Sequence, residues 1–233
     1  MKLSIAIMQP YFFPYLGYFQ LMAACDIFAL YDDAQYIKGG FVNRNRIHPA
    51  GGNSWFTLPV KTASHKLAIN QRHYEDYGKT GPQLSRLENC YGRAPHYDKV
   101  MALIDGVLRH PDRNVAKLNA FLLEEICTYL GWNRKFVDSS SIDCSPHHRG
   151  QDKVIALCKK LGADRYINAP GGRSLYDAAA FRAHGLELSF LEPSCPPYRQ
   201  FGGDFIPNLS IIDVLMFNEA DAVRAMIEGA TLA

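Results

Sequence analysis

The N-terminal part of the chain shows a strand, a helix and a second strand in its hydrophobic pattern. Residues 3–8 form a short apolar run that stops at Gln9 and Pro10, which is typical of a buried strand leading into a loop. Apolar residues then recur at helical spacing from Leu16 to Ala23, and another apolar run covers residues 27–31. This order predicts a βαβ unit, whose two strands are parallel and whose crossover is right-handed.

The middle of the chain has a different pattern. Residues 55–61 are typical of a third strand, and helical periodicity follows over residues 81–91, 96–108 and 114–130. Few strand signals interrupt these three stretches. We therefore predict a helical lobe, over about residues 78–135, that is inserted between the two halves of the fold.

Helices and strands alternate again towards the C-terminus. The pattern predicts a helix over residues 151–162, a strand over 164–169, a helix over 175–185, a strand over 186–193 and one or two closing helices over 209–230. Since both ends of the chain alternate in this way, we expect them to share one sheet. The prediction is a single α/β domain over residues 1–233, with an open, mainly parallel, Rossmann-like sheet.

Composition and charge argue against several classes of protein. The net charge is +2 and no long block of like charge occurs, so the charge does not indicate nucleic-acid binding. The six cysteines are scattered and form no C-x-x-C pair, and no apolar stretch approaches the roughly 20 residues that span a bilayer. We expect a cytoplasmic protein with reduced thiols and no membrane insertion. The oligomeric state stays open, and a homo-oligomer is one option.

The loop after the first predicted strand is rich in aromatic residues. In an open α/β sheet, ligands bind beyond the carboxyl ends of the strands, so this loop is a candidate site. Its tyrosines offer hydroxyl groups and flat faces to a ring, and the alternative is that the aromatic side chains only cover the sheet. The candidate residues are Gln9, Tyr11, Tyr15 and Tyr18.

The loop after the second predicted strand is rich in carboxylate, amide and guanidinium groups. Arginine can grip a phosphate or carboxylate with two parallel hydrogen bonds, and glycine lets backbone amides approach a ligand closely. The alternation in residues 41–47 also fits a solvated hairpin, which is the alternative. The candidates are Asp32, Asp33, Gln35, Lys38, Asn43, Arg44, Asn45 and Arg46, followed by Lys61 further along the chain.

Two further loops carry candidate residues. Residues 168–177 lie between a predicted strand and a helix, and contain Gly171, Gly172, Arg173 and Tyr176, although a Pro-Gly-Gly sequence is also a common turn. His147 lies in a second loop, where it would contact a phosphate group or act as a base; the alternative is that it is only solvated.

The sequence favours neither a metal site nor two well-known catalytic motifs. Histidines that are adjacent, as at positions 147 and 148, rarely bind one metal ion together, so zinc is disfavoured and no metal site is predicted. Neither a Walker motif nor a G-x-S-x-G elbow occurs.

These motifs together resemble the WbqC-like protein family. The stretches are MQPYFFPYLGYFQL, YDDAQYIKGGFVNRNRI, WFTLPVK, LGADRYINAPGGRSLYD and LSIIDVLMFN, in this order along nearly the whole chain. The resemblance implies a role beside the enzymes that build bacterial O-antigen, the lipopolysaccharide component, and other surface glycans. It also implies transfer of glycine or another aminoacyl group to an amino sugar. Near Gly40 the chain departs from the family pattern, because it has Gly-Phe where a Trp or Arg is frequent.

A shorter similarity concerns the first loop alone. A strand, a proline-containing loop and YLGY at the start of a helix are similar to the H-x-G-H signature of nucleotidyltransferases. Tyr15 and Tyr18 stand where that signature has histidines that meet the phosphates of ATP. A phenol donates a hydrogen bond but carries no positive charge near neutral pH. A nucleotidyltransferase-like sheet is therefore part of the fold prediction.

The leading hypothesis is an acyl- or aminoacyl- (glycine) transferase that acts on a nucleotide-linked amino sugar in surface polysaccharide biosynthesis. The tyrosines would line the sugar or base pocket, and the basic residues would hold phosphates. Asp32 or Asp33 would orient the amine or take its proton, and the predicted catalytic residues are Asp32, Asp33 and Tyr18. One alternative is a nucleotidyltransferase-like enzyme that activates a carboxylate with ATP and magnesium. Another is a non-catalytic protein that binds a nucleotide sugar. No motif requires a cofactor. All three hypotheses need the loops to converge on one anion-lined, ring-walled crevice.

Overall fold

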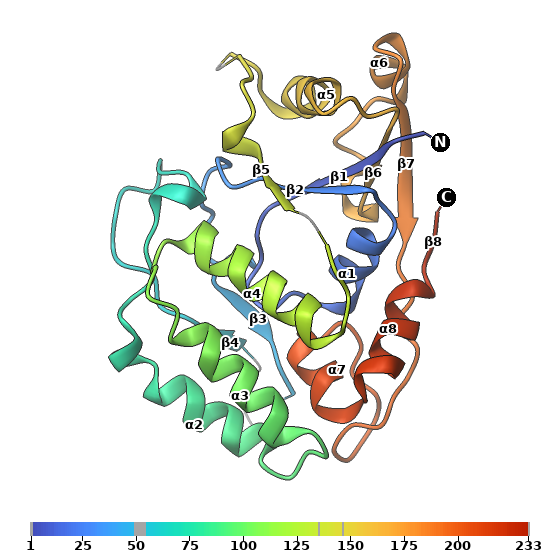
Figure 1. Ribbon diagram of the computed structural model, residues 1–233. Coiled ribbons are helices and arrows are strands. Elements are labelled where there is room, and N and C mark those ends of the chain that lie inside the picture. Colours follow the sequence, from blue (N-terminus) through green and yellow to red (C-terminus); the bar gives the residue numbers. More distant parts are fainter. Residues whose placement is uncertain (1, 49–54, 135, 146, 233) are drawn as a thin grey trace.

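The computed structural model is built around a six-stranded open sheet (Figure 1). It describes residues 2–48, 55–134, 136–145 and 147–232. The strand order is β5-β2-β1-β6-β7-β8, and every neighbouring pair is parallel except β7 and β8. The strands are β1 (Ser4–Met8), β2 (Ile27–Leu30), β5 (Phe136–Asp138), β6 (Arg165–Asn168), β7 (Glu187–Glu192) and β8 (Thr231–Leu232). The predicted open, mainly parallel α/β sheet is confirmed.

The predicted βαβ unit is present at the N-terminus. Strands β1 and β2 pair in parallel from Ile5↔Ile27 to Met8↔Leu30, and α1 (Leu16–Ala23) connects them. Alternate residues of these strands point to opposite faces of the sheet. Ile5 therefore packs into a smaller core with α5 (Gly150–Lys160) and α6 (Ala178–Ala183). The next residue, Ala6, packs into the larger core on the opposite face, with α1.

The middle of the chain lies between β2 and β5. It contains a two-stranded antiparallel hairpin, β3 (Arg44–Arg46) and β4 (Trp55–Thr57), and two short 3₁₀ turns, η1 (Ile69–Gln71) and η2 (Tyr77–Lys79). The hairpin was the alternative interpretation of this segment, and the strand predicted over residues 55–61 is shorter than expected. Three helices follow at the predicted places: α2 (Gly81–Tyr91), α3 (Tyr97–Leu108) and α4 (Val115–Tyr129). Their buried residues join those of α1 in the larger core.

The C-terminal helices close the larger core. They are α7 (Ile211–Phe217) and α8 (Ala220–Glu228), and α8 packs against α1. The segment that leads to α7 is fixed by the buried side chain of Asp213, which accepts hydrogen bonds from Tyr91 (2.8 Å) and Tyr198 (2.7 Å). Within the described ranges, every helix is too short or too polar to traverse a bilayer.

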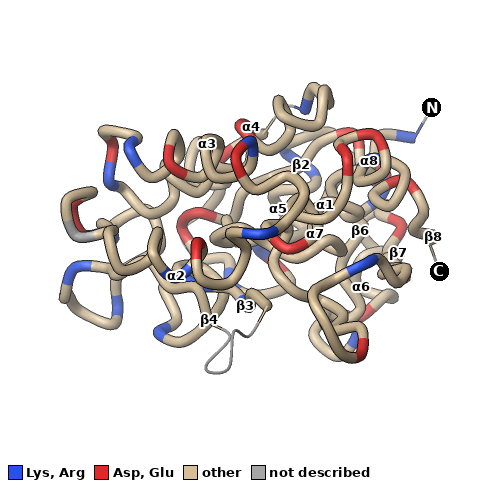
Figure 2. Tube along the Cα trace, turned by 90° about the horizontal axis from the view of Figure 1, so that it is seen from below, with Lys and Arg blue, Asp and Glu red and all other residues tan. Residues whose placement is uncertain are grey.

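Charged residues are mixed over the chain. Figure 2 shows Lys and Arg positions interspersed with Asp and Glu positions along most of the trace. No extended region of one sign stands out in this view. Any specific attraction for a charged ligand must therefore come from local groups of side chains, not from the overall field.

Candidate functional site

The carboxyl edge of the sheet is where the topology places a ligand. Chain order runs outward from β1 in both directions, through β2 and β5 on one side and through β6 and β7 on the other. The switch point lies between β1 and β6, and the loops that follow these two strands diverge there. In open α/β sheets such a point leaves a crevice for ligands.

A crevice of about 350 Å³ occupies this position. Its walls come from the loops that follow β1 and β6, and the loop after β2 contributes Phe41. The lining residues are Ile7, Met8, Gln9, Tyr11, Tyr15, Phe41, Asn168, Ala169, Pro170, Gly171, Gly172, Leu175 and Tyr176. None of these residues is Lys, Arg, Asp or Glu. The crevice is therefore lined by aromatic rings, but it has no cationic side chain that would attract an anion.

Distant side chains fix the backbone of the loop after β1. Phe13 has a φ of +41°, an unfavourable value for a bulky residue, and its side chain is buried. Its carbonyl oxygen accepts hydrogen bonds from Asn45 Nδ2 (3.0 Å) and Ser210 Oγ (2.7 Å). Asn119 Nδ2 donates to the carbonyl of Pro10 (2.8 Å). We call Asn45, Asn119 and Ser210 the loop clamp; it holds the loop in a conformation that local preferences disfavour.

Two tyrosines of this loop face the crevice. The Tyr11 ring lies 5.6 Å from the ring of Phe41 and 5.6 Å from that of Tyr18, measured between centroids. Burial raises the pKa of Tyr11, with Tyr15 adding to the shift, and burial alone raises the pKa of Tyr15. Both phenols therefore stay protonated at neutral pH and can donate hydrogen bonds. A Cβ atom on Gly17 would lie 2.7 Å from Tyr15 Cε2, so only glycine leaves room for this ring.

The loop after β6 forms the opposite wall. Asn168 Oδ1 accepts a hydrogen bond from the Ala169 amide (2.8 Å), which leaves Nδ2 as the donor end of the side chain. A Cβ atom on Gly172 would lie 2.0 Å from this Nδ2 and 3.2 Å from Tyr176 Cε2. The second glycine of the Pro-Gly-Gly turn is thus required by packing. At Gly171 a Cβ atom would meet nothing within 4 Å.

Tyr18, a predicted catalytic residue, lies in the core and does not line the crevice. Its side chain is 1% exposed, and its hydroxyl donates to the carbonyl oxygen of Gln9 (2.9 Å). Burial raises its pKa well above the ordinary range. This placement favours a positioning role, in which Tyr18 fixes the backbone of Gln9, over the predicted catalytic one.

The two adjacent aspartates have different surroundings. Asp32 is buried and accepts four hydrogen bonds, from Ser139 Oγ (3.0 Å), Ser140 N (2.9 Å), Ser140 Oγ (2.5 Å) and Asn70 Nδ2 (3.0 Å). The bonds from Ser139 and Ser140 join the end of β2 to the turn that follows β5, and the bond from Asn70 joins it to η1. Asp32 is 4% exposed, so it holds these segments together and a substrate amine cannot reach its oxygens.

Asp33 faces a polar cavity of about 220 Å³. Its carboxylate accepts from Lys153 Nζ (2.5 Å) and from Ser139 Oγ (2.6 Å), whose single hydrogen is shared with Asp32. The centroid of the Tyr31 ring lies 4.9 Å from Lys153 Nζ, which lines this cavity. Burial raises the pKa of Tyr31 to about 12, and the charge of Asp33 and then Tyr176 add to that shift. The cavity follows β2 and β5 and the crevice follows β1 and β6, so both lie at the carboxyl edge of the sheet. Sequence analysis did not identify Ser139 or Lys153, which follow a three-residue strand and lie on a helix, respectively.

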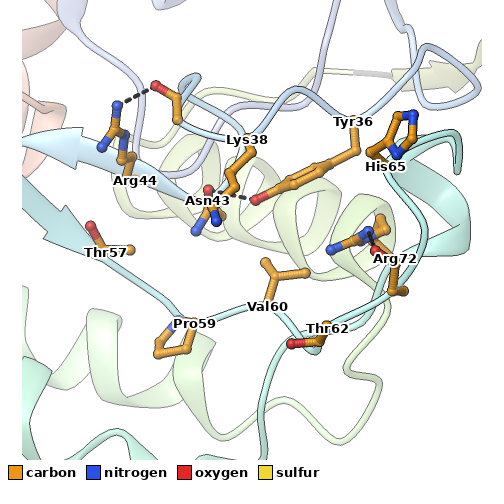
Figure 3. Close-up of a pocket in the computed structure, with 12 residues that line it drawn as sticks. Tyr36, Lys38, Asn43, Arg44, Thr57, Pro59, Val60, Thr62, His65 and Arg72 are labelled. Atoms are coloured by element: carbon orange, nitrogen blue, oxygen red, sulfur yellow. Dashed lines mark hydrogen bonds between the residues drawn. The ribbon is translucent and has the colours of Figure 1, made fainter.

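Three predicted residues lie in a separate groove of about 440 Å³ beside the hairpin (Figure 3). Asn43 is buried, accepts from the Tyr36 hydroxyl (2.8 Å) and donates to the Leu58 carbonyl (2.9 Å). Arg44 lies over the ring of Trp55, 4.1 Å from its centroid. Lys38 is the third, and the groove also contains Tyr36, His65 and Arg72, which sequence analysis did not select.

The remaining candidates lie outside the crevice and the groove. Asn45 belongs to the loop clamp, Gln35 Nε2 donates to the His65 carbonyl (3.0 Å), and Lys61 pairs with Asp76 (3.4 Å). Arg173 pairs with Glu192 beside the Phe190 ring, and both Arg46 and His147 are exposed. The predicted convergence on one site therefore holds for part of the set. The crevice gathers Gln9, Tyr11, Tyr15, Gly171, Gly172 and Tyr176.

Comparisons with known proteins agree with the motifs. The model of the WbqC-like protein family matches residues 9–225. A protein of Mycobacterium tuberculosis, named "Uncharacterized protein Rv1507c", is 30% identical over 224 residues, which cover 94% of this chain and 95% of the relative. No solved structure matches the chain.

Proposed function

Because the chain belongs to the WbqC-like protein family, we propose that it is an acyl- or aminoacyl-transferase that acts on a nucleotide-linked amino sugar for bacterial surface polysaccharides. The nucleotide sugar would occupy the crevice between β1 and β6. The observation that carries the proposal is the position of this ring-walled crevice at the switch point of a parallel sheet. In this proposal the sheet is Rossmann-like, with its parallel strands in the order expected of that class.

The chemistry of the walls fits the uncharged parts of such a ligand. The exposed faces of Tyr11 and Phe41 would stack on a base or sugar ring. The protonated hydroxyls of Tyr11 and Tyr15 and the Asn168 amide would donate hydrogen bonds to sugar or phosphate oxygens. No charged side chain among the lining residues competes for these groups.

The neighbouring polar cavity would carry out the transfer. The amine of the sugar attacks the carbonyl carbon of an activated acyl donor, a C–N bond forms, and the bond from that carbon to the leaving group breaks. The amine loses one proton, and Asp33 is the carboxylate placed to take it. The Lys153 ammonium, 2.5 Å from Asp33, would stabilise negative charge that develops on the carbonyl oxygen. Asp32 keeps Ser139 and Ser140 in place.

The ATP-dependent alternative has less support. It placed Tyr15 and Tyr18 at the histidine positions of the H-x-G-H signature, where both would meet phosphates. Tyr18 is 1% exposed and its hydroxyl is bonded to Gln9. A phosphate could not reach it without opening the core.

Thermal-shift titration with UDP-, dTDP- and GDP-linked amino sugars tests the binding part. We expect one of them to raise the melting temperature of the wild type, because a ligand that binds only the folded state stabilises it. Tyr11→Ala should abolish the shift and Tyr11→Phe should keep most of it, because stacking needs the ring. Tyr129→Ala, at the end of α4, is the control and should respond like the wild type.

Mass spectrometry of the sugar nucleotide with activated glycyl and acyl donors tests the transfer. The product should gain the mass of the acyl group, and Asp33→Asn should stop the transfer while the nucleotide sugar still binds. Binding without any transfer would favour the non-catalytic alternative. The proposal fails if no nucleotide sugar stabilises the protein, or if Tyr11→Ala binds as the wild type does.

A further inference from the structure

We propose that the groove beside the β3–β4 hairpin is a second ligand site, which binds the phosphate group of a small molecule. This site goes beyond the proposed function and does not depend on it. The groove is separate from the crevice and has the opposite chemical character. Its walls are Tyr36, Lys38, Gly39, Asn43, Arg44, Thr57, Pro59, Val60, Thr62, Ala63, His65 and Arg72.

The groove contains cations that lack partners of opposite charge. Lys38, Arg44 and Arg72 line it, and none of its lining residues is Asp or Glu. Within the described part of the chain, these three side chains form no ion pair. Figure 3 shows them arranged around one space. A bound anion would supply the negative charge that the protein does not provide.

Arg72 is the most informative of the three. It is 7% exposed, and its guanidinium donates to the carbonyl oxygens of Lys61 (3.1 Å), Ala63 (3.1 Å) and Ser64 (3.0 Å). Its Nε atom is buried and has no hydrogen-bond partner among the described residues. These partners are neutral, so the full positive charge stays at the base of the groove. A buried charge without a counterion is costly to stability, and an anion bound in the groove would offset that cost.

The side chain of Arg44 is held in place but not neutralised. Nε donates to the Gly40 carbonyl (3.3 Å), Nη2 donates to the Gly39 carbonyl, and Cζ lies 4.1 Å from the centroid of the Trp55 ring. Gly39 has a φ of +84°, a conformation that glycine adopts without strain, and this turn presents its carbonyl to Arg44. A guanidinium fixed in this way loses little entropy when it binds an oxyanion.

The size and surroundings of the groove favour a small phosphate ester over nucleic acid. Its volume of about 440 Å³ lies in the range of small-molecule pockets. A nucleic-acid surface would need an extended basic stripe, whereas the charges along the trace are mixed (Figure 2). The ring of Tyr36, fixed by its hydrogen bond to Asn43, offers an apolar face beside the Arg72 cation, whose Cζ lies 4.7 Å from the ring centroid. A phosphate ester could therefore contact the cations with its phosphate group and the Tyr36 ring with its organic group.

Tryptophan fluorescence can follow binding because Trp55 lies directly under Arg44. The chain has only two tryptophans, so a Trp132→Phe background isolates the signal of Trp55. The probes are inorganic phosphate and adenosine 5′-monophosphate, with adenosine as the uncharged match, in chloride buffer of constant ionic strength. We expect saturable binding of both phosphate probes and none of adenosine. Lys38→Gln and Arg44→Gln should each weaken binding about tenfold, the size of one charge-assisted hydrogen bond.

Arg46→Gln is the matched control. It removes the same charge from the same strand, two residues away, but Arg46 does not line the groove. Phosphate affinity within about twofold of wild type in this variant would support a specific site, because that change is far below one charge-assisted bond. The proposal is overturned if Arg46→Gln and Arg44→Gln weaken binding equally, which would show diffuse attraction. It is also overturned if neither phosphate probe saturates the signal.

Discussion

The crevice and the groove are neighbouring hollows with opposite chemistry. No residue that lines the crevice carries a charge, whereas Lys38, Arg44 and Arg72 line the groove. Phe41 connects the two, because its ring packs against Tyr11 in the crevice and, 5.9 Å away, against Trp55 beside the groove. The motif that the sequence suggested as one anion-lined site is therefore divided between two places.

A second division, within the hairpin motif itself, follows from the period of a β-strand. Alternate residues of a strand point to opposite sides, so the stretch from Asn43 to Arg46 separates into two sets. Asn43 and Asn45 point inward, where their amides bind backbone carbonyls. Arg44 and Arg46 point the other way, towards the surface. In this motif the amides build the structure, and the guanidinium groups are the ones left for ligands.

The largest expected effect comes from breaking the element on which both sites depend. Asn45 is 1% exposed, and its amide holds the crevice loop from within the hairpin that borders the groove. Asn45→Ala should lower the free energy of unfolding by about 2 kcal/mol, because buried carbonyls lose their donor. Binding at both sites should weaken as well. Urea unfolding and the two titrations described above measure these effects.

The neighbouring Arg46→Ala serves as the reference for Asn45→Ala. Its side chain is exposed, so its unfolding free energy should stay within about 0.5 kcal/mol of the wild type. Equal destabilisation by the two variants would contradict the separation of inward and outward residues. Loss of binding at one site alone in Asn45→Ala would show that the hairpin supports only that site.

An intermediate effect is expected from a change confined to the crevice. In Gly172→Ala the new methyl group would meet Asn168 at 2.0 Å, so the Asn168 amide and the crevice wall must shift. Nucleotide-sugar affinity should fall about tenfold, as for the loss of one good hydrogen bond, while phosphate binding in the groove stays unchanged. Isothermal titration of both ligands would show this difference.

Gly171→Ala is the control for Gly172→Ala. The added methyl group meets nothing within 4 Å, so both ligands should bind as they do to the wild type. If the two alanine variants behave alike, close packing at Gly172 does not shape the crevice. A loss of phosphate binding in Gly172→Ala would mean that the crevice and the groove are coupled.

The smallest effect should appear at alkaline pH. The pKa of Tyr31 is raised to about 12 by burial, then by Asp33 and Tyr176, so the folded state holds this proton more tightly than the unfolded chain does. The stabilisation is complete below about pH 10, the ordinary value for tyrosine, and is lost as the pH rises towards 12. Guanidinium groups in the groove keep their charge throughout this range.

Tyr31→Phe isolates this contribution. The unfolding free energy of the wild type, followed by urea titration from pH 9 upwards, should fall more steeply than that of the variant. Other buried tyrosines contribute equally to both proteins and cancel in the difference. Parallel curves would show that Tyr31 ionises as freely in the folded protein as in the unfolded chain.

Much of the fold could be predicted from the sequence because its signals are periodic and local. The helices α2, α3 and α4 begin and end within one residue of the apolar patterns at 81–91, 96–108 and 114–130. The βαβ unit at the N-terminus was equally clear. Strand β5 was missed because three residues cannot show a period, and β8 was missed for the same reason.

The site was less predictable because its parts meet across long separations. The donors to Asp32 include Ser139 and Ser140, more than a hundred residues away, and no local pattern links them. Arg72 was not selected because a single arginine near a polar turn is common in any sequence. The sequence identified the tyrosines of the first loop as candidates but could not tell which of them line the site. Only tertiary packing decides that Tyr11 faces the crevice and Tyr18 faces the core.

The loop clamp also bears on the order in which the protein can mature. Synthesis runs from the N-terminus, so Phe13 is made long before Ser210, which lies 197 positions later and completes its hydrogen bonding. Until that residue emerges, the Phe13 carbonyl has only Asn45 as a side-chain donor, so the unfavourable backbone is held incompletely, and closing such distant contacts is slow. The crevice should therefore reach its ligand-binding conformation late in folding, so that only completely folded molecules can bind a ligand.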